Sequence, residues 1–160
     1  MVTEIIGKAP EGNVFPTPSE LHSPQVMSRH VKELALYLDA QLAGIADLGR
    51  LDTELSHGYP FAVVCAVEAR YDPYTAQGFG GQAAVQAGQF VTFILAAWIR
   101  ELGYRATMKI EVPREQRERL SVAAGLGTLN SDGRLVVAKY GTGIHVADVV
   151  FTDLPLVADG

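Results

Sequence analysis

The residues whose types and spacing best suit ligand binding are glycines near the C-terminal end of this 160-residue sequence. Gly125 and Gly127 flank Leu126 at the expected end of a helix, and Gly133 closes an Asn-Ser-Asp-Gly turn shortly before the Tyr-Gly-Thr-Gly segment 140–143. Glycine lets a backbone turn sharply and approach a flat ligand with its N–H groups exposed. A helix C-cap followed by a tight turn would explain the first two glycines as well. The pattern therefore predicts either a surface for a flat ligand or a series of ordinary turns.

Other side chains that could take part in binding or catalysis are scattered through the sequence. Tyr71 and Tyr74 lie in a loop rich in glycine and aromatic residues. They are expected either to act on a ligand, by stacking on its ring or donating a proton, or to fasten the loop to the core. The histidines show no pairing at a metal-ligand spacing: they are His22, His30, His57 and His145. His145 falls in an expected strand near the glycine turns. It is expected to make a polar contact across the strands or, alternatively, to act as a metal ligand. No Ser-His-Asp or Cys-His arrangement is indicated by sequence position, and we predict no metal site.

Composition excludes several classes of protein. The chain has 13 Lys and Arg against 18 Asp and Glu, a net charge of −5, and no basic run, so nucleic acid is not an expected partner. The N-terminus lacks the features of a signal peptide, and the longest apolar stretch, 90–99, is too short to span a bilayer. We therefore expect a cytoplasmic protein without a membrane span. Cys65 is the only cysteine, and its valine-rich surroundings predict a buried core residue. A cluster ligated only by cysteines of one copy is excluded.

The N-terminal half of the sequence divides into an arm and the start of a domain. Residues 1–22 are rich in Gly, Pro and polar residues and are expected to form an extended arm, with at most one edge strand. Residues 23–160 are expected to form the domain. Ser23 and Pro24 resemble a helix N-cap and first helical position, and apolar residues at spacings of three and four continue to Ile45, which predicts a helix ending near Gly49.

The remaining elements predict helices packed on a sheet. After a polar segment, 50–60, the valine-rich run 61–69 predicts a buried strand. Residues 82–102 predict a helix that is apolar on nearly every side, suited to a core or a subunit interface. A strand at 105–112, a helix between Pro113 and Gly125, and strands at 134–138 and 144–152 complete the expected α+β domain.

Several stretches in register resemble the corrinoid-binding domain of reductive dehalogenases and epoxyqueuosine reductases. The similarity covers roughly residues 25–159, and its main stretches are 31–45, 90–106, 124–127 and 152–156. The resemblance implies a nitroreductase-like fold, with a central mixed sheet flanked by helices, that holds cobalamin. It further implies that one set of residues lines the macrocycle, mainly through backbone contacts and shape. These residues are Gly125, Leu126, Gly127, Thr128, Gly133, Tyr140, Gly141, Thr142 and Gly143.

The sequence departs from these families at the reactive positions. Their proton-donating tyrosine, nineteen positions before the tyrosine of the Leu-Gly-Tyr motif, corresponds to Val85 here, and an asparagine seven positions after that tyrosine corresponds to Glu111. A basic residue after the Ala-Gly-Leu-Gly motif corresponds to Ser131. A valine cannot act as a general acid. Any catalytic role would therefore pass to Tyr71, Tyr74 or Glu111.

These observations lead to two main hypotheses. The first is a cobalamin-binding domain without an iron–sulfur cluster, which would work with a separate iron–sulfur or flavin electron donor. The second is a degenerate, cofactor-free structural or assembly subunit of the same fold, present as a homo-oligomer or within a larger complex. A flavin or haem domain, with His145 as the axial ligand, is a third possibility.

Overall fold

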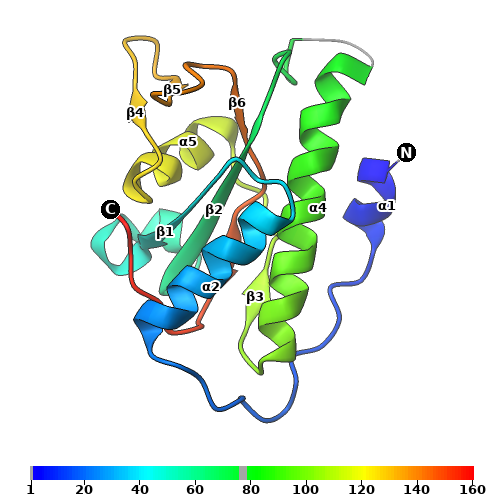
Figure 1. Ribbon diagram of the computed structural model, residues 1–160, viewed down its shortest axis with the longest axis vertical. Coiled ribbons are helices and arrows are strands. Elements are labelled where there is room, and N and C mark those ends of the chain that lie inside the picture. Colours follow the sequence, from blue (N-terminus) through cyan, green and yellow to red (C-terminus); the bar gives the residue numbers. More distant parts are fainter. Residues whose placement is uncertain (1, 76–78) are drawn as a thin grey trace.

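The computed structural model describes residues 2–75 and 79–160, and its centre is an antiparallel sheet (Figure 1). The strand order is β1 (Leu42–Asp47), β2 (Phe61–Glu68), β7 (Val150–Thr152) and β3 (Ala106–Thr107), and β6 (Ile144–Val146) also pairs with β2. Each pair among the described strands is antiparallel. The expected α+β class is confirmed, whereas the expectation of a mixed sheet is wrong for the described strands.

Helices cover both faces of the sheet. On one face, α2 (Pro24–Tyr37) and α4 (Phe79–Glu101) pack on the sheet, and α5 (Arg114–Ala123) packs on the other. A short hairpin of β4 (Thr128–Leu129) and β5 (Leu135–Val136) lies beside α5. The chain also forms the short elements α1 (Val2–Lys8), η1 (Leu48–Arg50) and α3 (Thr53–Ser56).

Strand β2 joins the two halves of the core. Successive side chains of a strand point to opposite faces, so Val63 and Cys65 belong to the cluster beneath α2 and α4, while Val64 and Ala66 belong to the cluster beneath α5. Burial raises the pKa of the Cys65 thiol to about 12. Cys65 is thus a buried core residue, as its sequence context predicts.

Helix α4 forms much of one core layer. By length and composition alone, its segment Gln82–Glu101 is the one candidate for crossing a membrane among the described residues. Core helices of soluble domains meet the same criterion, and Val91, Leu95 and Ile99 of this segment are fully buried inside the domain. We therefore assign α4 to the core.

The single long helix expected between Ser23 and Gly49 is wrong. Ser23 does cap α2, since its Oγ accepts a hydrogen bond from Val26 N at 3.3 Å, but the helix ends at Tyr37. The chain then turns through Asp39, whose φ is 79°, and enters β1. A Cβ atom at Gly44 would collide with the carbonyl oxygen of Ala124, so glycine permits α5 to approach β1 closely.

Other boundaries also differ from the sequence expectations. The strand expected at 105–112 is limited to Ala106–Thr107, and the one expected at 134–138 to Leu135–Val136. The last expected strand, 144–152, is two strands, β6 and β7, which pair with opposite ends of β2. Residues 147–149 interrupt the strand. The stretch 144–152 therefore pairs with both ends of β2, through β6 at one end and β7 at the other.

The N-terminal arm is wholly extended in the sequence prediction but contains helix α1 in the structure. The rest of the arm lies along the C-terminal end of α4, where Phe15 N donates to Arg100 O at 2.9 Å and Ser19 N donates to Leu102 O at 2.8 Å. Glu11 holds the arm through its carboxylate. Its Oε1 accepts from Thr107 Oγ1 at 2.7 Å, and its Oε2 lies 3.2 Å from Nη1 of the buried Arg100.

Replacement of Glu11 by alanine is expected to release this arm. Arg100 would keep its bond to Ala106 O but lose its counter-charge, which should lower the free energy of unfolding by about 1–2 kcal/mol. Urea denaturation measures this loss, and limited proteolysis should cut the arm faster. Glu20→Ala, at an exposed position of the same arm, is the matched control. Equal unfolding free energies for the two variants would contradict the anchoring role of Glu11.

Candidate functional site

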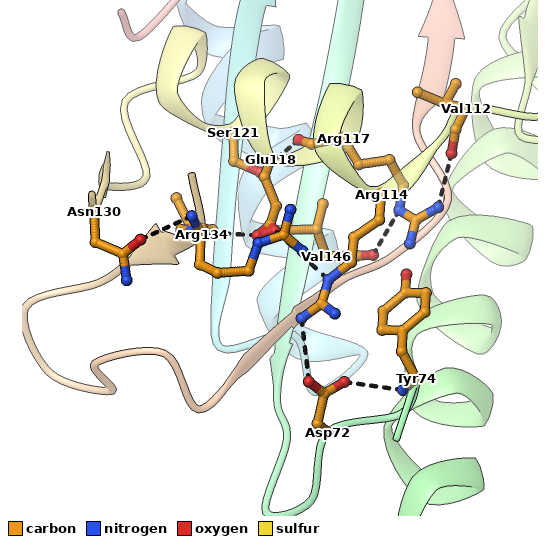
Figure 2. Close-up of polar contacts among 11 residues, drawn as sticks. Asp72, Tyr74, Val112, Arg114, Arg117, Glu118, Ser121, Asn130, Arg134 and Val146 are labelled. Atoms are coloured by element: carbon orange, nitrogen blue, oxygen red, sulfur yellow. Dashed lines mark hydrogen bonds and ion pairs between the residues drawn. The ribbon is translucent and has the colours of Figure 1, made fainter. Parts of the chain in front are cut away.

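A polar cleft of about 550 Å³ opens at the C-terminal end of β2. Its walls come from the loop after β2, from α5, from the β4–β5 hairpin and from the segment before β6 (Figure 2). The side chains that give it its character are Asp72, Arg114, Glu118, Asn130, Arg134 and Thr142. Because its walls carry both donors and acceptors, the cleft suits a ligand that carries both kinds of group.

Glu118 is the centre of the charge network in the polar cleft (Figure 2). It is 5% exposed, and its Oε1 accepts from Leu135 N at 3.0 Å, which ties the hairpin to α5. Its Oε2 lies 3.7 Å from both Arg114 Nε and Arg134 Nη1 and has no hydrogen-bond partner within the described part of the chain. Arg114 also pairs with Asp72 at 3.5 Å. Glu118 thus places a buried carboxylate oxygen between two arginines at the wall of the cleft.

A second cavity, the Arg117 pocket, lies next to the polar cleft and shares Pro73 with it. Its volume is about 230 Å³, and its principal lining residues are Tyr74, Val85, Gln89, Arg117, His145 and Asp148. Arg117 spans the space between α5 and the sheet, donating from Nη1 to Val112 O at 2.7 Å and from Nε to Val146 O at 3.2 Å. Both cavities therefore depend on side chains of α5.

The electrostatics of the Arg117 pocket follow from burial. Burial, together with the nearby Arg117 and Arg114 charges, lowers the pKa of His145 to about 4 against the opposing effect of Asp72, so the imidazole is neutral at physiological pH. Burial also raises the pKa of Asp148, against the opposing effects of Arg117 and of a hydrogen bond to Gln89. The pocket thus holds a cation and an acid around a neutral imidazole.

Tyr74 covers the pocket from the loop after β2. Its backbone N–H donates to Asp72 Oδ1 at 2.9 Å, and its ring lies 4.1 Å from the Arg114 guanidinium carbon and 6.2 Å from the His145 ring centroid. An aromatic face attracts a cation placed over it. Arg114 therefore holds the Tyr74 ring through this contact, and it holds the loop through its ion pair with Asp72. Of the catalytic candidates, Tyr74 lines the Arg117 pocket, as Val85 does, whereas Tyr71 lines a different hollow next to α4. Glu111 is exposed and lines neither the polar cleft nor the Arg117 pocket.

The residues predicted to line a cofactor fall into two groups. Thr142 and Gly143 line the polar cleft. Gly133 and Gly141 have positive φ values of 76° and 58° and open space around the Cβ position. Tyr140 packs against the core beneath α5. This group stands at or next to the cleft.

The other group serves the packing of the chain itself. A Cβ atom at Gly127 would collide with Val136 O, and one at Gly125 would lie 3.2 Å from Asp159 O. Leu126 belongs to the same turn and Thr128 begins β4, and neither residue lines the cleft. Glycine at 127 is therefore required by the close approach of β4 to β5, and a bulky substitution there would disrupt the hairpin whether or not a ligand binds.

The glycine N–H groups are also occupied. Gly125 N donates to Val122 O, Gly133 N to Asn130 O, and Gly143 N to Tyr140 O, at 2.9–3.0 Å. Gly141 N donates to Val137 O at 2.6 Å. The expectation that these turns offer N–H groups to a ligand is wrong for these four positions, so the polar capacity of the site resides in side chains.

The charged side chains of α5 and of the hairpin that line the two cavities are the ones that sequence reasoning missed. Arg114, Arg117 and Glu118 lie on a helix rich in charged residues and look like an ordinary solvated face, and Arg134 follows a turn. A cue was available, since Glu118 and Arg114 are four residues apart and so share one side of α5. The described residues bring together no group of three His, Cys, Asp or Glu side chains that would hold a metal ion.

These features define an α+β domain whose antiparallel sheet, covered by helices on both faces, carries a polar cleft at one end. No family model matches the chain, and no curated protein is significantly similar to it. Solved structures are similar over nearly its whole length. The catabolic reductive dehalogenase NpRdhA superposes with a TM-score of 0.78 at 26% sequence identity, covering 99% of this chain and 24% of that one. The same enzyme in complex with 3-bromo-4-hydroxybenzoic acid gives 0.77 at 26% identity and the same coverage.

A further solved structure, described as suggesting a mechanism for B12-dependent dehalogenation by a reductive dehalogenase, gives a TM-score of 0.75 at 24% identity. It is covered to the same extent, 99% of this chain and 24% of that one. The chain therefore has a reductive dehalogenase-like fold. It spans about a quarter of the length of these proteins.

Proposed function

We propose that this chain is a cobalamin-binding domain of the reductive dehalogenase type, and that the polar cleft holds one edge of the corrinoid. The observation that carries the proposal is that the likeness to B12-dependent reductive dehalogenases extends over 99% of the chain. The polar cleft also opens beside Thr142 and Gly143, two of the residues that the sequence resemblance implicates.

The residues of the cleft fit this group. A corrinoid carries amide side chains around its ring, and each amide offers both donors and an acceptor. Arg134 and Asn130 can donate to the amide carbonyls, and the carboxylate of Asp132, which also lines the cleft, can accept from an amide N–H. A whole corrinoid is larger than a cleft of about 550 Å³, so this chain supplies one wall of the site. Other walls would come from a partner or a further domain.

The role of this chain would be binding and orientation. Bound cobalamin supplies the redox chemistry through its cobalt, whereas a protein positions such a cofactor and tunes its surroundings. Arg114 holds the Tyr74 loop at the mouth of the cleft through Asp72 and the tyrosine ring. Val85 cannot supply a proton, and Tyr74, which lines the Arg117 pocket together with Val85, is the catalytic candidate best placed to do so. We propose that electrons come from a separate iron–sulfur or flavin protein.

Cobalamin uptake tests the proposal. After mixing with hydroxocobalamin and desalting, the protein is expected to retain an equimolar amount of the cofactor with a base-off visible spectrum. Thr142→Trp places a large side chain at the mouth of the cleft from an exposed position and should weaken uptake at least ~10-fold. The control, Thr53→Trp, is exposed on α3, away from the cleft. A colourless wild-type protein, or equal uptake by both variants, would contradict the proposal.

The alternative is a cofactor-free assembly subunit of the same fold. The observation in its favour is that Gly125 and Gly127 serve internal packing, and that the N–H groups of Gly125, Gly133, Gly141 and Gly143 bond within the chain. This alternative predicts a stable oligomer that takes up no corrinoid, which sedimentation velocity measured together with the uptake experiment would reveal.

A further inference from the structure

The Arg117 pocket carries opposite charges that do not meet. Arg117 and Asp148 both line it and attract one another electrostatically, yet no ion pair joins them among the described contacts. From this arrangement we infer that the pocket binds a small carboxylic acid that also bears a hydrogen-bond donor, with the carboxylate at Arg117 and the donor at Asp148. Binding of such a ligand does not require cobalamin, although Tyr74 of the same pocket is the proposed proton donor.

Arg117 is built to hold an anion. Its hydrogen bonds to Val146 O and Val112 O use Nε and Nη1, so Nη2 takes no part in these bonds. Both acceptors are neutral carbonyls, and no ion pair among the described contacts joins the guanidinium to Asp148 or Glu118, the two carboxylates that act on it electrostatically. A guanidinium held this way is preorganised for a carboxylate, because arginine remains charged when buried and its planar group matches the two oxygens.

Asp148 and His145 define the other end of the ligand. The Asp148 carboxylate is partly buried and bonds to Gln89, and it retains acceptor capacity for a hydroxyl or ammonium group. The imidazole of His145 is 8% exposed and makes no hydrogen bond among the described residues. Since it is neutral at physiological pH, it has one donor and one acceptor for the ligand. Together these groups favour a ligand with a donor near its carboxylate over a simple carboxylate.

The walls of the pocket set the size and shape of the ligand. A volume of about 230 Å³ is below the ~300–1,000 Å³ of clefts that hold drug-sized molecules. The ring of Tyr74 forms one side, and Val85 and Pro73 add apolar surface. A compact hydroxy or amino acid with a flat apolar group therefore fits both the charges and the walls.

Matched probes test this inference. Mandelate carries a carboxylate, a hydroxyl and a ring, phenylacetate lacks the hydroxyl, and mandelamide lacks the charge. Isothermal titration calorimetry on the whole chain is expected to show mandelate binding about 5-fold more tightly than phenylacetate and at least ~10-fold more tightly than mandelamide. Arg117→Gln should weaken mandelate binding at least ~10-fold, whereas Arg119→Gln, on an exposed turn of the same helix that pairs with Asp52, should leave it unchanged.

Two variants keep the test decisive. If circular dichroism shows that Arg117→Gln does not fold, Asp148→Leu removes the acceptor at the other end of the pocket and should abolish the preference for mandelate over phenylacetate. The inference is overturned if no probe binds, if the three probes bind equally, or if mandelate binds the Asp148→Leu protein with its preference intact. None of these outcomes depends on whether cobalamin is taken up.

Discussion

Replacing Glu118 with leucine is expected to lower the free energy of unfolding by about 2–4 kcal/mol. Glu118 is 5% exposed, and its loss would leave Leu135 N without its acceptor and two arginines without their shared carboxylate. Chemical denaturation of the purified protein measures the effect. Removal of one partner from a buried ionic network is costly because the remaining charges stay in a poorly solvated site.

Two further variants separate the causes. Glu118→Gln keeps an acceptor for Leu135 N and should lose only about half as much stability, since it removes the charge alone. Glu115→Leu changes an exposed glutamate on the same helix and should shift stability by no more than about 0.5 kcal/mol. If Glu118→Leu were as stable as Glu115→Leu, the hairpin would not depend on this carboxylate.

Acidification is expected to destabilise the protein through His145. The folded pKa of this imidazole, about 4, lies below its ordinary value of 6.5, so the folded state favours the neutral form. The resulting stability is fully present above pH 6.5 and is lost as the pH falls from 6.5 toward 4. The loss attributable to His145 over this range is about 3 kcal/mol.

Urea denaturation at pH 7 and pH 4 tests this linkage. His145→Gln cannot gain the proton, so its stability should fall by about 3 kcal/mol less than that of the wild type between the two pH values. His22→Gln, at an exposed position, should show the same pH-dependent loss as the wild type. Equal losses for the wild type and His145→Gln would mean that the buried imidazole does not set the acid limit.

Local patterns in the sequence predicted the elements whose signals are local. The N-cap at Ser23, the buried strand β2, the apolar helix α4 and the end of α5 all follow from neighbouring residues, and the structure confirms them. Strand β1 was missed because Leu42 and Ile45 continue the helical spacing of α2. What decides their structure is pairing with β2, through Leu42 opposite Ala66 and Ile45 opposite Val63, and this pairing is invisible to a local pattern.

The site was predicted only in part, for a similar reason. Thr142 and Gly143 were named because glycine-rich turns are recognisable in sequence, and they do line the polar cleft. Arg114, Glu118 and Arg134 could not be identified, because charged residues on a helix and after a turn are ordinary surface features. They become a network only when the β4–β5 hairpin folds back over α5 and buries Glu118 beneath Leu135.

The way the C-terminal segment pairs along β2 has a consequence for how the protein folds. Phe61 faces Thr152 and Glu68 faces Ile144, so one side of the central strand is completed by residues far away in the chain. Folding rates fall as the mean sequence separation of contacts rises. While the chain is being synthesised, this side of β2 remains an unpaired edge until β6 and β7 have been made and can pair with it. Unpaired edges invite association with other chains, so slow folding, and aggregation of nascent or truncated chains, are the expected cost of this topology.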